Sequence, residues 1–291
     1  MPAWMELLAQ VSEELAEEAT ARLIEAGATA VETRDTQPGV CLLITHFLFE
    51  AGATQKLRTS EAALAKIGVS PGAIAVRNIE EVDWVTRSRE SFTARAYGDR
   101  LWVRPPWDSP GAPENCEEII LEPSLAFGTG RHPSTTLCLK AIDRMCAAGS
   151  PERFLDIGCG SGILSVAALK LGAGWALALD LDPNAADTAL KLAKENDLTG
   201  RMRILTGTLE PNTAGDWWGR VDMLAANIFL NPLRELAPAM FEVLAPGGRG
   251  VLSGIGYEQV DTLAEIAGAA GLIVSGRKYH HEWAAIEIEK P

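Results

Sequence analysis

A glycine-rich loop between a short apolar run and a helix-like segment constrains the fold more than any other feature of this sequence. The loop reads Asp156-Ile-Gly-Cys-Gly-Ser-Gly162 and follows a buried strand predicted at residues 153–157. Glycine adopts positive φ and lets backbone N–H groups approach a ligand closely. In an open sheet of parallel strands, such a loop lies at the carboxyl edge, where ligands bind. The sequence therefore predicts an α/β sheet with a ligand site at this loop.

The same succession of strand, turn and helix continues to the end of the chain. Strands that alternate with helices of this length predict a parallel sheet covered on both faces. Only a short polar segment, residues 276–281, joins the last two strands, so we expect these two to pair antiparallel. The seven predicted strands are 153–157, 176–180, 202–206, 221–226, 250–253, 272–275 and 283–288. The predicted helices after the loop are 163–171, 183–195, 233–244 and 258–270.

The first 80 residues follow a different order. Four apolar runs and two helix-like segments alternate as strand, helix, strand, strand, helix, strand, which is the split βαβ arrangement with both helices on one face of a small sheet. The strands are predicted at 4–11, 28–33, 40–49 and 73–79, and the helices at 13–27 and 54–66. Charged sequence, paired prolines and a turn-rich run then predict a linker. We therefore expect three parts: 1–80, a linker over 81–115, and 116–291.

Composition narrows the class of protein. The net charge of −13 argues against non-specific binding of nucleic acid, which needs clustered Lys and Arg. Five cysteines without a C-x-x-C pair indicate neither a disulfide framework nor a zinc site. The acidic N-terminus is unlike a signal peptide, and no apolar run approaches the roughly 20 residues that span a bilayer. We expect a soluble, cytoplasmic protein with no direct sequence-specific contact to nucleic acid, no membrane contact and no bound metal.

A carboxylate and an amide stand at the ends of two other predicted strands. Asp180 follows Gly158 by 22 residues, where an acceptor-only side chain can bind both hydroxyls of a ribose. Asn227 ends its strand at the same edge and can accept a hydrogen bond from an amine nucleophile or bind the cofactor. A helix cap is the alternative role for Asn227, although Asn231, just before Pro232, is better placed to cap.

The spacing of the loop glycines separates two kinds of nucleoside ligand. A dinucleotide loop needs G-x-G-x-x-G, but Ile163 occupies the third glycine position and the spacing here is G-x-G-x-G. Asp156, inside the loop, would repel a pyrophosphate and tolerate an ammonium group. These features favour S-adenosylmethionine over a dinucleotide.

A second glycine-rich segment lies upstream, with Gly130 only 28 residues before Gly158, and the two loops suggest walls of one pocket. It reads Ser124-Leu-Ala-Phe-Gly-Thr-Gly-Arg-His-Pro-Ser-Thr-Thr136 and resembles G-[LM]-A-F-G-T-G-T-H-P-T-T, the signature of the ribosomal protein L11 methyltransferases. Departures from it include Ser124 and Arg131. Other matches to that family are Trp4, Glu6, Asp83-Trp84, the 156–162 loop, Asp180 to Pro183, Asn227 to Leu233, Gly247-Gly248, Leu252 to Gly254 and Trp283.

The resemblance implies a seven-stranded class I S-adenosylmethionine-dependent methyltransferase (Rossmann-like) domain. It also implies a small ferredoxin-like α+β domain before it, which recognises the ribosomal protein. The implied activity is methyl transfer to lysine side chains and the N-terminal amine of ribosomal protein L11, free or on the large subunit. The implied cofactor-binding residues are Phe127, Thr136, Gly158, Gly160, Asp180 and Asn227, with Phe127 near the methyl donor and Asn227 also catalytic.

Two other functions remain open at this point. The chain could methylate lysines of a different protein, such as an electron-transfer flavoprotein subunit, but the extra N-terminal 80 residues argue against this. It could also be a non-catalytic ribosome-binding protein with a vestigial cofactor site. The intact set of Gly158, Asp180 and Asn227 argues against that loss. His132 could be a general base, but a structural hydrogen bond at a helix start is the favoured role.

Overall fold

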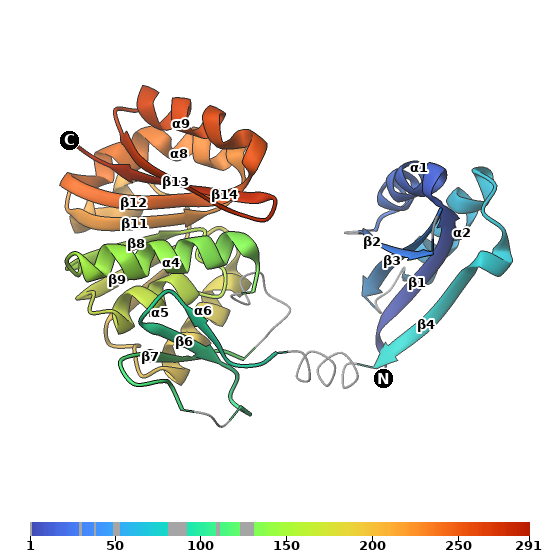
Figure 1. The fold of residues 1–291 in the computed structure, drawn as a ribbon, viewed down its shortest axis with the longest axis horizontal. Coiled ribbons are helices and arrows are strands. Elements are labelled where there is room, and N and C mark those ends of the chain that lie inside the picture. Colours follow the sequence, from blue (N-terminus) through green and yellow to red (C-terminus); the bar gives the residue numbers. More distant parts are fainter. Residues whose placement is uncertain are drawn as a thin grey trace. The chain divides into compact units, whose positions relative to one another are not determined.

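The computed structural model describes residues 2–28, 31–37, 39–48, 53–80, 92–108, 111–122 and 131–291. The chain divides into two compact units, Met1–Ser91 and Phe92–Pro291 (Figure 1). Within the described part, no helix is long and apolar enough to cross a membrane. Phe127, a predicted site residue, lies outside the described residues.

The first unit is an antiparallel four-stranded sheet with two helices, in the βαββαβ order that the sequence predicts. Its strands lie in the order β2-β3-β1-β4. A short 3-10 turn, η1 (Pro71–Ala73), precedes the last strand. The elements are β1 (Pro2–Ser12), α1 (Glu13–Glu25), β2 (Val31–Gln37), β3 (Val40–Leu48), α2 (Ala53–Lys66) and β4 (Ile74–Glu80).

Both helices cover the same face of this sheet. Leu7 and Leu43 point from the central strands into a core that includes Leu23 of α1 and Leu64 of α2. Because side chains alternate across a strand, the even-numbered neighbours on β1 and β3 face the opposite side. Among the described residues of this unit, no helix lies on that second face, which we call the helix-free face.

A buried carboxylate lies on the helix-free face. Glu6 is 5% exposed, and its two oxygens meet His46 Nε2 at 3.0 Å and Arg77 Nε. Burial raises the pKa of Glu6, but hydrogen bonds and charge from Arg77 and His46 outweigh burial and leave the pKa lowered. The strands on either side of β1 thus supply the partners that a buried charge requires.

The second unit is built on a seven-stranded sheet in the order β10-β9-β8-β11-β12-β14-β13. All neighbours are parallel except β14, which runs antiparallel to β12 and β13, as the sequence predicts for the last two strands. The strands are β8 (Arg153–Ile157), β9 (Trp175–Asp180), β10 (Met202–Thr206), β11 (Val221–Asn227), β12 (Leu244–Gly256), β13 (Ile273–His280) and β14 (Trp283–Glu289). The predicted polar connection 276–281 is mostly part of β13, and the chain turns at His281, where φ is +52°.

Helices pack on both faces of this sheet and bury two separate apolar clusters. One face carries α4 (Pro133–Ala147), α5 (Ile163–Lys170) and α6 (Pro183–Glu195). The other carries α8 (Leu230–Val243) and α9 (Val260–Ala269), with the short α7 (Pro211–Ala214), η2 (Gly215–Trp217) and η3 (Tyr257–Gln259) between strands. This arrangement confirms the predicted fold class.

Helix α8 begins earlier than the sequence predicts. Its N-cap is Phe229 and its first residue is Leu230, so Asn231 lies inside the first turn and does not cap the helix. Pro232 is accommodated there because the first-turn N–H groups have no intrahelical acceptor.

A three-stranded sheet begins the second unit. Its first two strands lie within the predicted linker, 81–115, and its third strand lies just after it. It comprises β5 (Arg95–Tyr97), β6 (Leu101–Arg104) and β7 (Glu117–Ile120), in that spatial order. Leu101 and Val103 are buried in the same cluster as α4. Two alternate apolar positions in a four-residue strand give little sequence signal, and the prolines that suggested a linker follow β6.

The side chain of Asn196 links this small sheet to α6 by hydrogen bonds. It is 5% exposed at the end of α6, and its Oδ1 accepts from Ile120 N at 2.8 Å. Its Nδ2 donates to Ile120 O and Leu192 O at 2.8 and 2.9 Å. The side chain thus satisfies both backbone groups of the last residue of β7.

We predict that Asn196→Ala destabilises the protein by about 2 to 4 kcal/mol, because buried backbone groups of Ile120 and Leu192 lose a partner. Denaturant unfolding measures this change. Asn184→Ala, at an exposed side chain on the same helix, is the control and should cost within roughly 0.5 kcal/mol. Equal effects of the two changes would contradict the role given to Asn196.

Candidate active site

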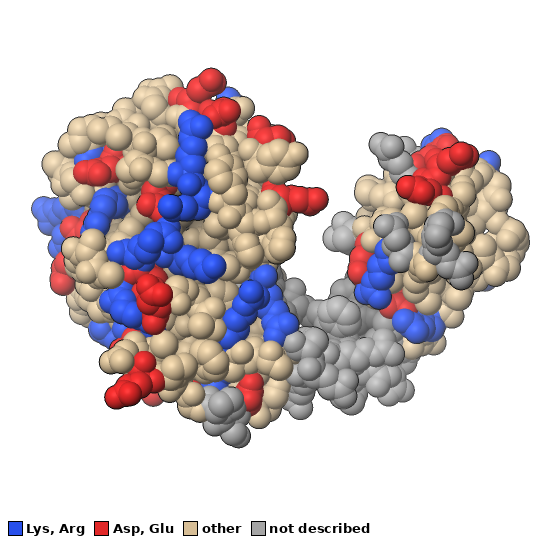
Figure 2. Space-filling model, viewed as in Figure 1, with Lys and Arg blue, Asp and Glu red and all other residues tan. Residues whose placement is uncertain are grey.

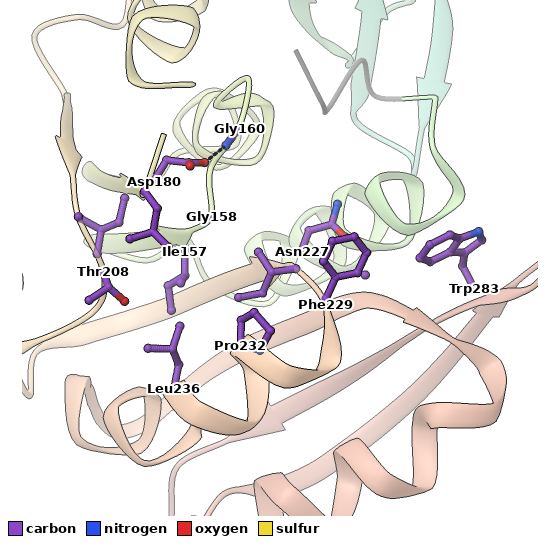
Figure 3. A pocket seen from close by; sticks show the side chains of 15 residues that line it. Ile157, Gly158, Gly160, Asp180, Thr208, Asn227, Phe229, Pro232, Leu236 and Trp283 are labelled. Atoms are coloured by element: carbon purple, nitrogen blue, oxygen red, sulfur yellow. Dashed lines mark hydrogen bonds between the residues drawn. The ribbon is translucent and has the colours of Figure 1, made fainter. Parts of the chain in front are cut away.

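A pocket of about 450 Å³ opens where the carboxyl ends of β8, β9 and β11 meet (Figure 3). Three residues predicted from strand ends and turns line it together: Gly158, Asp180 and Asn227. Gly160 lines it as well. The rest of the wall is mostly apolar and includes Ile157, Leu179, Leu181, Ile228, Phe229, Pro232, Leu236 and Trp283.

The glycine loop is held against the neighbouring strand by its own backbone. The N–H groups of Gly158 and Cys159 both donate to Leu179 O, at 2.8 and 3.0 Å. Gly158 has φ of +69°, and a Cβ there would collide with Ile228 Cγ2. A side chain at position 158 would therefore strain the loop and push into the pocket wall.

Asp180 is oriented by two backbone donors. Its Oδ2 accepts from Gly160 N at 2.8 Å, and its Oδ1 accepts from Asp182 N at 3.0 Å (Figure 3). An ionised carboxylate has about four acceptor sites, so each oxygen keeps capacity for one more donor. Leu181, the next residue, is 75% exposed and lines the same end of the pocket. A carboxylate beside an open apolar surface suits a ribose joined to a flat base.

Asn227 lies at the other end of the pocket, beside Phe229 (Figure 3). Its Nδ2 donates to Thr135 Oγ1 at 3.1 Å. Its Oδ1 is buried and has no hydrogen-bond partner among the described residues. A buried acceptor without a donor is costly, so this carbonyl is suited to a ligand that brings an N–H or O–H group.

The residue of α4 that contacts Asn227 is Thr135. The sequence analysis names its neighbour, Thr136, as a cofactor-binding residue. Thr136 is also buried, but its Oγ1 has no partner among the described residues and it does not line the pocket. Successive helix residues are about 100° apart, so only one of two adjacent threonines can face a given strand. Neither threonine lines the pocket, and the run Ser134-Thr135-Thr136 gives no means of choosing from sequence which one contacts Asn227. The cofactor contact expected of Thr136 stays a prediction.

Asp156 does not line the pocket, contrary to the expectation that its charge faces a ligand from the loop. It belongs to β8, is fully buried, and its Oδ2 accepts from Ser165 N and Ser165 Oγ at 3.1 and 2.8 Å. Strand alternation turns this side chain toward α5. The pKa of Asp156 is raised to about 7. Burial and the charge of Asp180 raise this pKa, and the hydrogen bonds from Ser165 partly oppose them.

Trp283 lines the pocket and is in contact with the ring of His132. His132 caps α4, where its Nδ1 lies 2.7 Å from Ser134 Oγ, so the predicted structural hydrogen bond at a helix start is confirmed. Its ring meets Trp283 edge-on, with centroids 4.3 Å apart. Burial lowers the pKa of His132. Phe229, 73% exposed, completes an apolar opening.

The strand order, the glycine loop after β8 and the acidic residue ending β9 define the chain as a class I S-adenosylmethionine-dependent methyltransferase. Comparison with known proteins specifies the family. The family model described as ribosomal protein L11 methyltransferase (PrmA) matches residues 3–291, so the chain belongs to that family. The resemblance identified from sequence is thereby confirmed.

Individual relatives agree with this assignment. The chain is 33% identical over 275 residues to the ribosomal protein L11 methyltransferase of Klebsiella pneumoniae, covering 90% of this chain and 91% of that protein. It is 39% identical over 236 residues to the enzyme of Dechloromonas aromatica, covering 79% and 76%. A crystal structure of ribosomal protein L11 methylase from Lactobacillus delbrueckii subsp. bulgaricus matches with a TM-score of 0.61 and 28% identity, over 69% of this chain and 100% of that one.

The buried Asp156 predicts a pH-dependent stability. Its pKa rises from 3.8 in the unfolded chain to about 7 in the folded protein, so the folded state binds this proton more tightly. Stability from this group is therefore full below about pH 4 and is lost as pH rises through 7, by a few kcal/mol. In Asp156→Asn, the unfolding free energy relative to wild type should increase between pH 4 and pH 8.

Denaturant unfolding across this pH range measures the difference. Asp187→Asn, an exposed carboxylate on α6, is the control and should keep a constant difference from wild type. A difference for Asp156→Asn that does not change with pH would contradict the raised pKa.

Proposed function

We propose that this protein transfers methyl groups from S-adenosylmethionine to lysine side-chain and N-terminal amines of ribosomal protein L11. The observation that carries the proposal is the polarity of the pocket. A preoriented carboxylate, Asp180, stands at one end. At the other end stands an amide carbonyl, Asn227 Oδ1, that has no hydrogen-bond partner in the described part of the chain. The names of the relatives support ribosomal protein L11 as the substrate.

The residues at the Asp180 end fit the nucleoside part of the cofactor. Gly158 leaves the wall open where a side chain would meet Ile228, and Asp180 has acceptor capacity left for two ribose hydroxyls. Leu181 and Leu236 offer apolar surface for a base. When bound, S-adenosylmethionine supplies a methyl group on a positively charged sulfonium. Among the described lining residues, Asp180 is the one ionisable side chain, so no strong base stands at the other end.

The residues at the Asn227 end fit an amine acceptor. A lysine has a pKa near 10.4 and must lose its proton before it can act as a nucleophile. Phe229 and Trp283 form an apolar opening that disfavours the charged ammonium. Asn227 Oδ1 then accepts a hydrogen bond from an N–H of the neutral amine. The lone pair of the amine nitrogen stays free to attack the methyl group. Thr135 holds the Asn227 amide in this orientation, so rate comes from positioning.

We also propose that the first unit recognises ribosomal protein L11 through its helix-free sheet face. Leu8 and Leu42 lie there, half-buried, around the Glu6 carboxylate and its partners His46 and Arg77. The face therefore offers both apolar contact area and polar groups that a protein partner can bind. The opposite side of the unit is taken by α1 and α2.

The proposed activity is tested by incubating the protein with labelled S-adenosylmethionine and either purified ribosomal protein L11 or an electron-transfer flavoprotein subunit. We expect label on ribosomal protein L11, with mass spectrometry locating it on lysines and the N-terminus. Transfer only to the flavoprotein subunit would refute the proposed substrate. If neither protein is labelled and calorimetry shows no binding of S-adenosylmethionine, the proposal that this protein transfers methyl groups is wrong.

Substitutions at the two ends of the pocket should affect different quantities, cofactor affinity at one end and kcat at the other. Asp180→Ala removes two charge-assisted hydrogen bonds and should weaken cofactor binding about 100-fold or more in calorimetry. Asn227→Ala should lower kcat roughly 10- to 100-fold and change cofactor affinity less, because the lost contact is to the acceptor amine. Asp187→Ala, exposed on α6, should change neither quantity. A variant at Asn227 with normal kcat and weakened cofactor binding would contradict the assignment.

Two matched lysine substitutions separate the faces of the first unit. Leu42→Lys places a charge on the helix-free face and should raise KM for ribosomal protein L11 about tenfold or more, with kcat little changed. Thr59→Lys places the same charge on α2, beside a groove between the two helices, and should leave KM unchanged. A raised KM for Thr59→Lys with an unchanged KM for Leu42→Lys would indicate that the helices, and not the helix-free face, recognise ribosomal protein L11.

A further inference from the structure

Three large aromatic side chains are exposed at the carboxyl edge of the seven-stranded sheet, near the helices α8 and α9. Phe229 is 73% exposed, Tyr257 is 60% exposed and Tyr279 is 57% exposed. Phe229 is the N-cap of α8, Tyr257 begins η3 just before α9, and Tyr279 is the last residue but one of β13. Exposed aromatic groups that lie together mark a surface that binds a partner. We call these three residues the aromatic rim.

The aromatic rim begins at the pocket itself. Phe229 is one of the lining residues of the pocket (Figure 3). Tyr257 is connected to a second lining residue, Trp283, through the backbone. Its N–H donates to Glu282 O at 3.0 Å, and the residue before it, Gly256, is the strand partner of Trp283. Both aromatic residues therefore lie beside the opening through which a substrate enters.

Tyr279 extends the aromatic rim on the same side of the sheet. It is the strand partner of Ala284, the residue that follows Trp283 in β14. Ala284 belongs to the apolar cluster beneath α8 and α9. Directly opposite residues of an antiparallel pair share one face, so Tyr279 lies on the side of α9, as does Tyr257 in the turn that leads into α9. The two tyrosines therefore flank the backbone of Trp283.

The surroundings of the two tyrosines are acidic. The segments 254–261 and 279–284 contain Glu258, Asp261 and Glu282 but neither lysine nor arginine. Glu258 and Glu282 are exposed, and neither forms an ion pair with any described residue. Arg277, the cation on this side of β13, is neutralised by Asp261 at 2.7 Å. Lys and Arg side chains gather over the middle of the opposite face, which carries α4 (Figure 2). Unpaired negative charge therefore accompanies the aromatic rim.

We propose that the aromatic rim, with Glu258 and Glu282, docks a basic segment of ribosomal protein L11 that surrounds the target amine. This inference rests on the proposed function, because it takes the pocket as the place where that amine enters. An amine with a pKa near 10.4 arrives protonated, so positive charge reaches the opening before the neutral nucleophile forms. Tyrosine rings attract cations over their faces, and carboxylates at an opening steer cations toward it. The aromatic rim is thus a second contact surface for the substrate, in addition to the helix-free face of the first unit.

The first test removes the rings. Surface plasmon resonance of the full-length protein measures the Kd for free ribosomal protein L11. Tyr257→Ala/Tyr279→Ala should raise this Kd about tenfold or more, because aromatic groups at an interface contribute much of its binding energy. Tyr257→Phe/Tyr279→Phe keeps the rings and should bind like the wild type. The matched control is Trp175→Ala, which removes a 50% exposed ring where β9 begins, at the opposite edge of the sheet, and should leave the Kd unchanged.

The second test reverses the charges. Glu258→Lys/Glu282→Lys should raise the Kd about tenfold or more at 50 mM salt and much less at 500 mM, because salt screens exposed charges. Asp187→Lys/Glu265→Lys has the same net charge, with exposed carboxylates changed on α6 and in the middle of α9, and should change the Kd less than about threefold. Calorimetry with S-adenosylmethionine should give the same cofactor affinity for all these variants, which shows that they are folded.

Two results would overturn the proposal: an unchanged Kd in either the tyrosine-to-alanine or the charge-reversed variant, or a loss of affinity in either control equal to that of the variant it matches. Failure of the proposed function would appear differently, as a wild-type protein that transfers no methyl group to ribosomal protein L11. Normal transfer by the wild type, together with normal binding by the variants of the aromatic rim, would overturn this inference alone.

Discussion

The hydrogen bonds that Gly158 and Cys159 donate to the carbonyl of Leu179 hold the rest of the site in position. They fix the loop after β8 against β9, and this places Gly160 N within 2.8 Å of Asp180 Oδ2. Because β8 lies between β9 and β11, the same edge also receives Asn227. The pocket is therefore a consequence of parallel strand order and of one loop that only glycine can form.

The pocket separates two tasks along its length. Asp180 has both oxygens bound to backbone donors and so presents a fixed charge to a nucleoside. Asn227 has its amide nitrogen engaged by Thr135 and its oxygen left without a described partner. Asp156, directly beneath the loop, contributes through the backbone and hydroxyl of Ser165, not by contact with the pocket. A charged group that binds and a neutral group that positions thus stand at opposite ends of an apolar wall.

Much of this site could be predicted from the sequence because strand ends and glycine turns leave local signals. Asp180 and Asn227 each follow an apolar run that can only be a buried strand, and both lie on the pocket. Three features could not be predicted. The choice between Thr135 and Thr136 depends on the rotation of α4 about its axis, which a run of hydroxyl residues does not specify. The direction of Asp156 depends on which face of β8 meets α5. The strands β5 and β6 are too short for their three buried positions, Tyr97, Leu101 and Val103, to outweigh the neighbouring prolines and charges.

The most direct test of the central claim is a crystal structure of the full chain with S-adenosylhomocysteine. The account predicts that the ribose hydroxyls contact the Asp180 carboxylate, that the loop from Gly158 to Gly160 lies against the ligand, and that the sulfur faces the Asn227 end of the pocket. A ligand bound away from Asp180, or one whose sulfur points away from Asn227, would contradict it.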